Sequence, residues 1–312
     1  MKIDPDILQR CWFLAGPTAS GKSAVGLELA ERLGAEIVSL DSMALYRGMD
    51  IGTAKPDAAA RQRIPHHLLD LLEPHQEFSV ADYLRAADAA CRDILARRRI
   101  PLFVGGTGLY LRAILRGVFA GPAADWTYRQ QLETVAEEQG AEELHRRLQE
   151  VDPAAGLRLH PHDLRRVIRA LEVQHLTGRP LSATQQQAEL PVDQRPPHVY
   201  WLNAERTVLN AAIDRRVEAM FAGGLVDEVR RLMTGAKSPG RTARQALGYR
   251  EVFDHLAGAF DLVQTVARVQ THTRQFAKRQ RTLFRGLVEC RPVPLAGHET
   301  PGEIAQRLLS GG

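Results

Sequence analysis

A glycine-rich loop between a short apolar run and a helical pattern is the feature that most constrains this chain. Residues 11–16 read CWFLAG, residues 16–23 read GPTASGKS, and residues 22–33 have apolar side chains at helical spacing. The loop follows the pattern G-x-x-x-x-G-K-[ST], in which small residues let backbone N–H groups surround a phosphate at a helix N-terminus. The three segments together predict a buried parallel strand, a phosphate-binding loop and a helix. They indicate a polyphosphate ligand without saying which one.

Further strand and helix patterns alternate along the chain. Apolar runs predict strands at residues 35–41, 66–72, 100–106 and 197–203. Residues 79–99 form an amphipathic helical pattern with Ser79 as its N-cap. After residue 204 the pattern is helical and closes with a short tail. Strands that alternate with helices predict an α/β fold whose sheet is parallel, with right-handed crossovers.

Residues 121–196 break this alternation. The stretch is helical and charged, contains no strand pattern, and ends in the turn-rich segment LPVDQRPP. We interpret it as an insertion that returns the chain to the sheet at His198. The sequence therefore predicts an α/β core of residues 1–120 and 197–312, and an inserted all-helical domain of residues 121–196.

Composition is that of an ordinary globular protein. Of 312 residues, 44% are hydrophobic and 25% charged, and the net charge of +4 is mild, so any argument for nucleic-acid binding depends on local clusters. The three cysteines are scattered singly and predict neither a disulfide framework nor a zinc cluster. No apolar run approaches the ~20 residues of a membrane helix. We expect a cytoplasmic protein without a membrane partner.

Polar residues follow two of the predicted strands. Asp41 lies in SLDSMALYRGMDIGTAKP (39–56), and Thr107 lies in GGTGLY (105–110). Open α/β sheets bind their ligands at the carboxyl edge of the strands, where both residues are expected. There Asp41 can bind or deprotonate an acceptor group, or it can cap the next helix. On the loop, Lys22 adds a positive charge and the Ser23 hydroxyl can ligate Mg²⁺.

Three segments carry enough basic residues to bind RNA. Residues 274–285, RQFAKRQRTLFR, carry five basic residues, no acidic one, and two phenylalanines. Residues 165–169, RRVIR, and residues 244–250, RQALGYR, are also basic. Basic groups bind phosphate backbone and aromatic rings can stack on bases. Taken alone, these residues fit a solvated helix face with core phenylalanines better.

Six segments together resemble the bacterial tRNA dimethylallyltransferase family, also called the tRNA isopentenyltransferases. They are GPTASGKS, DSMALYRGMDIGTAKP, HHLLD, GGTGLY, RRVIRALEV and RQFAKRQRTLFR, which occur in the family's order over nearly the whole chain. The resemblance implies a P-loop-containing nucleoside triphosphate hydrolase-like core with a parallel sheet, plus an inserted helical domain. It also implies transfer of a dimethylallyl group from dimethylallyl diphosphate to N6 of an adenine next to the anticodon (position 37) of tRNA, with release of diphosphate.

The same resemblance implies a cofactor, partners and roles for residues. Mg²⁺ is the expected cofactor, with Ser23 as its protein ligand, and the expected partners are the tRNA anticodon stem-loop and dimethylallyl diphosphate, bound by a monomer. The implied catalytic residues are Asp41 as general base, with Lys22, Thr107 and Arg216 stabilising the diphosphate. Arg215 stays open as an alternative to Arg216. The implied diphosphate-binding residues are Gly16, Pro17, Thr18, Ala19, Ser20, Gly21, Lys22 and Ser23. The implied tRNA-binding residues are Asp41, Ser42, Met43, Ala44, Thr107, Arg129, Arg165, Arg166, Arg169, Arg244, Gly248, Tyr249, Arg250, Arg274, Lys278, Arg279 and Arg281.

The chain departs from the family pattern at a few positions. Ala44 stands where the family often has glutamine, so a side-chain contact to the base is in question. Ser23 replaces a common threonine, and Leu283 a common tryptophan. Three alternatives remain: a P-loop kinase with ATP in the loop and Asp70 holding Mg²⁺, an adenylate isopentenyltransferase that prenylates a free nucleotide, and an RNA-binding protein with an inactive loop.

Overall fold

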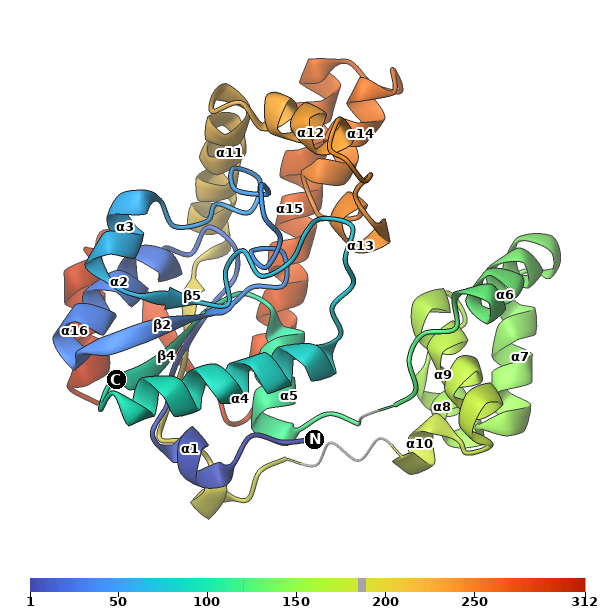
Figure 1. Ribbon diagram of the computed structural model, residues 1–312, viewed down its shortest axis with the longest axis horizontal. Helices are drawn as coiled ribbons and strands as arrows, with labels where there is room; N and C mark the ends of the chain where they lie inside the picture. The colour runs from blue at the N-terminus through green and yellow to red at the C-terminus, as the bar shows by residue number, and fades with distance from the viewer. Residues whose placement is uncertain (120, 185–188, 312) are drawn as a thin grey trace. The chain divides into compact units, whose positions relative to one another are not determined.

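The computed structural model describes residues 1–119, 121–184 and 189–311 (Figure 1). The chain forms two compact units. One contains Lys2–Arg116 and the chain from Glu189 onward, and the other contains Met1 and the described residues from Gly117 to Thr184. Residues 189–196, which the sequence analysis placed in the insertion, are grouped with the larger unit, where the Leu190 N–H donates to the Glu289 carboxylate at 3.3 Å.

The larger unit is built on a six-stranded parallel sheet, which confirms the predicted fold class. Its strands run in the order β3-β2-β4-β1-β5-β6. Their bounds are β1 (Trp12–Ala15), β2 (Ala35–Leu40), β3 (His66–His67), β4 (Ile100–Gly105), β5 (His198–Ala204) and β6 (Arg291–Leu295). The run at 66–72 was predicted as a longer strand, but Leu68 and Asp70 have φ values of 59° and 54°, which end the extended conformation.

Strand β6 was not predicted, because its sequence RPVPL contains two prolines. A proline has no N–H to donate to a sheet ladder and is confined to edge strands. Pro292 and Pro294 satisfy this rule, since β6 pairs only with β5 at the end of the sheet. The expectation that everything after residue 204 is helical was therefore wrong.

Helices connect and cover these strands. They are α1 (Pro5–Gln9), α2 (Lys22–Leu33), α3 (Ala58–Arg63), α4 (Val80–Ala96), α5 (Gly108–Arg116), η1 (Val192–Gln194), α11 (Arg206–Ala222), α12 (Leu225–Met233), α13 (Arg241–Arg244), α14 (Tyr249–Leu256), α15 (Leu262–Arg285) and α16 (Pro301–Leu309). The predicted N-cap of α4 is confirmed, because Ser79 and Asp82 form a reciprocal capping box. Within the described residues, no helix is both long and apolar enough to cross a membrane.

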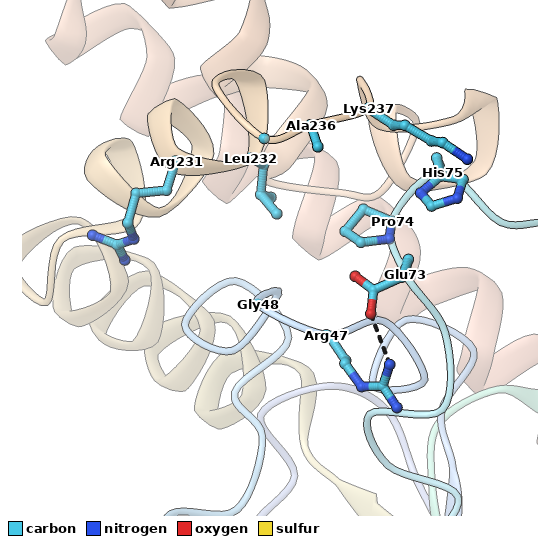
Figure 2. Close-up of a pocket in the computed structure, with 10 residues that line it drawn as sticks. Arg47, Gly48, Glu73, Pro74, His75, Arg231, Leu232, Ala236 and Lys237 are labelled. Carbon is cyan, nitrogen blue, oxygen red and sulfur yellow. Dashed lines mark hydrogen bonds and ion pairs between the residues drawn. The ribbon is translucent and has the colours of Figure 1, made fainter.

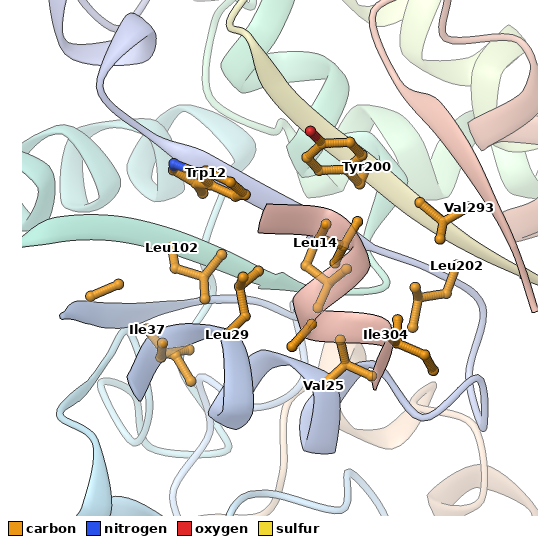
Figure 3. Packing of buried hydrophobic residues seen from close by; sticks show 14 of the residues in the cluster. Trp12, Leu14, Val25, Leu29, Ile37, Leu102, Tyr200, Leu202, Val293 and Ile304 are labelled. Carbon is orange, nitrogen blue, oxygen red and sulfur yellow. The ribbon is translucent and has the colours of Figure 1, made fainter. Parts of the chain in front are cut away.

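Two helices far apart in the sequence hold the phosphate loop against the sheet. The aliphatic side chains of Val25 and Leu29 on α2 and Ile304 on α16 pack with Leu14 of β1 in one buried cluster (Figure 3). The opposite face carries Phe13 and Trp201, and Trp201 stacks on Phe284 of α15 with ring centroids 6.0 Å apart. Burial of β1 on both faces fixes the strand from which the phosphate loop departs.

The described residues of the smaller unit form helices and connecting segments, and none of them forms a strand. Its helices are α6 (Trp126–Gln139), α7 (Ala141–Val151), α8 (Pro153–Arg158), α9 (Leu164–Thr177) and α10 (Leu181–Thr184). Leucines of α6 and α7 pack against Val167 and Leu171 of α9 in a core of the unit's own. The unit therefore buries an apolar core without contributing to the sheet.

Candidate active site

The carboxyl edge of three neighbouring strands brings the predicted segments together. Ala15 of β1 is in register with Gly105 of β4, and Gly105 is in register with Leu40 of β2. The phosphate loop follows Ala15, Asp41 follows Leu40, and the Thr107 N–H donates to the Leu40 carbonyl at 3.0 Å. A Cβ atom on Gly105 would lie 2.2 Å from that carbonyl oxygen, so only glycine permits this close approach.

The loop from Gly16 to Ser23 has the backbone of an anion-binding nest. Ala19 and Gly21 have φ values of 62° and 80°, and Gly21 is the N-cap of α2. The first N–H groups of α2 have no carbonyl partner inside the helix, and the helix dipole adds positive potential there. The Ser20 hydroxyl oxygen is buried and, among the described residues, has no hydrogen-bond partner. These features fit a bound phosphate group.

Two cations and one carboxylate interact electrostatically at this edge. Burial and then the neighbouring Arg216 guanidinium lower the pKa of Lys22 to about 8, and Asp41 partly opposes them. Burial likewise lowers the pKa of Arg216, on α11, and Asp41 opposes it. Arg216 is partly buried, whereas Arg215 is exposed to solvent. Of the two arginines that the sequence left open, Arg216 therefore is the one beside Lys22 and Asp41.

Asp41 uses one oxygen to shape the turn after β2. Its Oδ1 accepts the N–H groups of Met43 and Ala44 at 2.8 and 3.4 Å. No hydrogen bond of the described residues uses Oδ2, so the carboxylate caps a turn and still has a free acceptor. The Thr107 hydroxyl accepts the Ser42 N–H at 3.0 Å, which ties the β2 and β4 turns together. The Ala44 side chain is buried.

Gln280 of α15 is a site residue that sequence reasoning missed. Its side-chain oxygen accepts the Thr18 N–H at 2.9 Å, and its side-chain nitrogen donates to the Gly106 carbonyl at 2.7 Å. The side chain is only 6% exposed. The available signal was a polar residue on the buried face of α15, in step with Ala277 and Phe284.

Comparison with known proteins agrees with this geometry. The sequence model of the family described as IPP transferase matches residues 44–287, and that described as isopentenyl transferase matches residues 9–70. The chain belongs to the tRNA dimethylallyltransferase family. A tRNA dimethylallyltransferase of Geobacter metallireducens is 48% identical over 276 residues, which cover 88% of this chain and 89% of that protein. One of Geobacillus kaustophilus is 45% identical over 297 residues, covering 95% and 92%.

Solved structures of the family have the same fold. The tRNA isopentenylpyrophosphate transferase of Bacillus halodurans has a TM-score of 0.69 and 37% identity, covering 96% of this chain and 94% of its own. A eukaryotic dimethylallyltransferase acting on tRNA has a TM-score of 0.75 and 26% identity, covering 96% and 77%. The family resemblance and the enzyme class predicted from the sequence are thereby confirmed.

The residues at the start of α2 are compatible with the predicted Mg²⁺ ion, which needs few protein ligands. Magnesium bound to phosphates commonly keeps several waters and takes one or two protein oxygens. Ser23 is exposed at the start of α2 and can supply one of them. Asp70, the carboxylate required by the kinase alternative, is instead paired with Lys55 at 2.6 Å and Arg61 at 2.7 Å.

The segment after Asp41 is anchored by one buried carboxylate. Glu228 of α12 accepts the backbone N–H groups of Asp50, Ile51 and Gly52, at 2.8 to 3.3 Å. The Tyr249 hydroxyl also donates to Glu228, at 2.6 Å, and the tyrosine side chain is fully buried. The Tyr249 side chain thus helps to hold residues 50–52 and is not exposed to solvent, while its predicted role in tRNA binding stays a prediction.

The other predicted tRNA-binding residues of the larger unit fall into two groups. Arg244, Arg250, Lys278 and Arg279 are exposed. Arg274 pairs with Asp214 of α11, Gly248 is buried, and Arg281 donates to the Asn203 side chain at 3.3 Å. Within the exposed group, Arg250 also pairs with the buried Glu251 carboxylate at 2.9 Å, and Arg244 lies 5.0 Å above the centre of the Phe253 ring.

In the helical unit, a buried carboxylate neutralises part of the predicted basic surface. Arg129 forms two hydrogen bonds of 2.8 Å with Glu172, and Arg169 pairs with the same carboxylate. Arg129 therefore joins α6 to α9, whereas Arg169 lies on the same helix as Glu172 and also donates to the Pro122 carbonyl at 3.0 Å. Arg165 and Arg166 are exposed.

A separate hollow of about 490 Å³ lies between the turn at Arg47 and Gly48, residues 73–75 and the chain at the end of α12 (Figure 2). Its lining residues are Arg47, Gly48, Glu73, Pro74, His75, Arg231, Leu232, Gly235, Ala236 and Lys237. None of the predicted diphosphate-binding residues lines it. The Arg47 guanidinium forms an ion pair with the Glu73 carboxylate, at 2.7 Å.

The pKa of Lys22 predicts a pH dependence of donor binding. A bound diphosphate favours the charged amine, whereas the free enzyme loses that proton as the pH rises through about 8. The affinity for dimethylallyl diphosphate, measured by calorimetry without tRNA, should therefore fall above about pH 8, by up to about tenfold per pH unit. The Lys22→Met variant should bind weakly and lack this decline. Unchanged wild-type affinity from about pH 7 to about pH 9.5 would contradict the assignment.

Proposed function

We propose that this enzyme transfers the dimethylallyl group of dimethylallyl diphosphate to N6 of an adenine next to the anticodon (position 37) of tRNA, releasing diphosphate. The observation that carries the proposal is the meeting of a phosphate loop, Lys22 and Arg216 with the carboxylate of Asp41 at one sheet edge. An anion site next to a free carboxylate oxygen is what transfer from a diphosphate to an N–H nucleophile requires.

On the donor side, the loop binds the diphosphate and stabilises it as it leaves. The bond between the allylic carbon and the bridging oxygen breaks, and negative charge builds on that oxygen. We assign loop N–H groups, Lys22 and Arg216 to the stabilisation of this charge, since donors held by the protein around a developing charge lower the barrier. Ser23 would hold Mg²⁺, which when bound neutralises part of the diphosphate charge.

On the acceptor side, Asp41 serves as the general base. An adenine amino group is a weak nucleophile because its lone pair is delocalised into the ring. As N6 forms its bond to the allylic carbon, Asp41 Oδ2 takes one of its protons, which lowers the barrier. The hydrogen bond from the Ser42 N–H to the Thr107 hydroxyl joins the turn that carries Asp41 to the turn that carries Thr107.

The RNA-binding side rests on the exposed cations. Lys278, Arg279, Arg244 and Arg250 in the larger unit, and Arg165 and Arg166 in the helical unit, have solvent-exposed side chains. We assign them to backbone phosphates of the anticodon stem-loop. The target adenine must leave its stack to reach Asp41, which costs only a few kcal/mol in an unpaired loop. We further propose that the enzyme acts as a monomer in the cytoplasm.

One incubation separates the candidate functions. The protein is mixed with Mg²⁺, unmodified tRNA and either dimethylallyl diphosphate or ATP, and the digested nucleosides are weighed by mass spectrometry. We expect adenosine to gain one five-carbon unit with the diphosphate donor and nothing with ATP. Phosphate transfer from ATP would support a kinase, preferential prenylation of free AMP the nucleotide-level enzyme, and RNA binding without product an inert binder. Any of these three results would overturn the proposal.

A further inference from the structure

We infer that Gln280 is a positioning residue for the donor diphosphate, acting through the phosphate loop. Its amide joins the Thr18 N–H to the Gly106 carbonyl, 262 and 174 residues away in the chain. The inference rests on the proposed function of this site, because it assigns the loop to the diphosphate of the prenyl donor.

The amide is committed to these two partners. The side-chain oxygen accepts a backbone N–H at 2.9 Å, and the side-chain nitrogen donates to a backbone carbonyl at 2.7 Å. A Cβ atom on Gly106 would lie 2.5 Å from the Gln280 nitrogen, so the turn after β4 approaches the amide as closely as glycine allows. Because the side chain is buried, water cannot replace either bond without cost.

The bond to Thr18 fixes the direction of the following N–H groups. Ala19, the next residue, has a φ of 62°, a conformation that a non-glycine residue keeps only when its surroundings enforce it. The Thr18 N–H is turned toward α15 and the Ser20 N–H donates to the Pro17 carbonyl at 3.3 Å, which leaves the Ala19 N–H and those of Gly21 and the start of α2 to face the anion. Gln280 therefore preorganises the nest without touching the ligand.

The same helix carries the proposed RNA contacts. Lys278 and Arg279 are exposed one turn or less from Gln280, while Gln280 itself points into the protein. Helix α15 thus carries both the exposed cations assigned to RNA and the side chain that holds the phosphate loop. A change at Gln280 should act on the donor, whereas a change at Lys278 should act on tRNA.

The test uses glutamate and leucine at position 280. Gln280→Glu keeps an oxygen for the Thr18 N–H, but at neutral pH its second oxygen faces the Gly106 carbonyl without a proton to donate. When protonated, the glutamate regains a donor and both bonds. Gln280→Leu loses both bonds at every pH. Gln275→Ala, an exposed glutamine on the same helix, is the matched control.

The readout is the Kd of dimethylallyl diphosphate without tRNA, as a ratio to wild type. We expect Gln280→Glu to bind roughly 10-fold more weakly near pH ~7.5 and to approach wild type near pH ~5, since burial raises the pKa of a carboxyl group. Because the pKa of Lys22 is about 8, its charge also changes near the upper end of this range, so each variant is compared with wild type at the same pH. Gln280→Leu should bind the donor roughly 10- to 100-fold more weakly at both pH values, and Gln275→Ala should bind it as wild type does.

Two results would overturn the inference: donor binding by Gln280→Leu within about twofold of wild type, or a Gln280→Glu defect that does not change with pH. If Gln280→Leu fails to fold, the glutamate variant still decides, because its two states are compared within one protein. Donor binding by wild type without transfer to tRNA would contradict the proposed function instead, and the binding ratios would still test Gln280.

Discussion

Replacement of Lys22 by alanine is expected to abolish prenyl transfer, lowering the single-turnover rate by ~10³-fold or more. Lys22 lies on the phosphate loop in a partly buried site, where a charge acts more strongly than it does in water. Without Lys22, only Arg216 of the two cations remains to stabilise the departing diphosphate. The rate is measured with saturating donor and labelled tRNA, so that weaker donor binding does not account for the loss.

Lys2 provides the control for this substitution, because it is a lysine exposed to solvent near the start of the chain. Lys2→Ala should leave the rate unchanged. A Lys22→Ala rate within about tenfold of wild type would mean that the loop binds something other than the leaving group.

Residues close in sequence to a strand end were predictable, and residues that reach the site from elsewhere were not. The loop pattern and the positions of Asp41 and Thr107 after their strands predicted one shared edge, because carboxyl ends of parallel strands coincide. Gln280 lies more than 170 residues from both of its partners, and no local pattern encodes that contact. Its burial depends on how α15 packs against the sheet.

Charge patterns in the sequence overstated the basic surface. The segment RRVIR was interpreted as basic and Arg129 was listed as a tRNA-binding residue, but the buried Glu172 carboxylate pairs with both Arg169 and Arg129. Tyr249 similarly lies in a basic stretch, yet its contacts with Glu228 are set by the packing of α12 and α14. Such pairings come from tertiary structure, so a charge run alone could not separate exposed arginines from braced ones.

Replacement of Asp41 by asparagine is expected to lower kcat by at least ~10²-fold while changing donor affinity by less than about threefold. Asparagine keeps an oxygen that can accept the Met43 and Ala44 N–H groups, so the turn after β2 is preserved. Its second group is an amide nitrogen, which cannot take a proton from N6. Asp50→Asn, an aspartate of the same loop with a side chain 56% exposed, is the control and should retain wild-type kcat.

The pH of this measurement matters because Asp41 also acts on the cations beside it. Asp41 raises the pKa of Lys22, so its neutralisation lets that pKa fall below about 8. Near pH ~6.5 Lys22 should still be charged in the variant, and a loss of kcat there reflects the missing base rather than a weakened donor site. A kcat near wild type at that pH would remove Asp41 from proton transfer and leave it as the cap of the turn. A loss that appears only above about pH 8 would assign Asp41 to charge balance with Lys22 and Arg216.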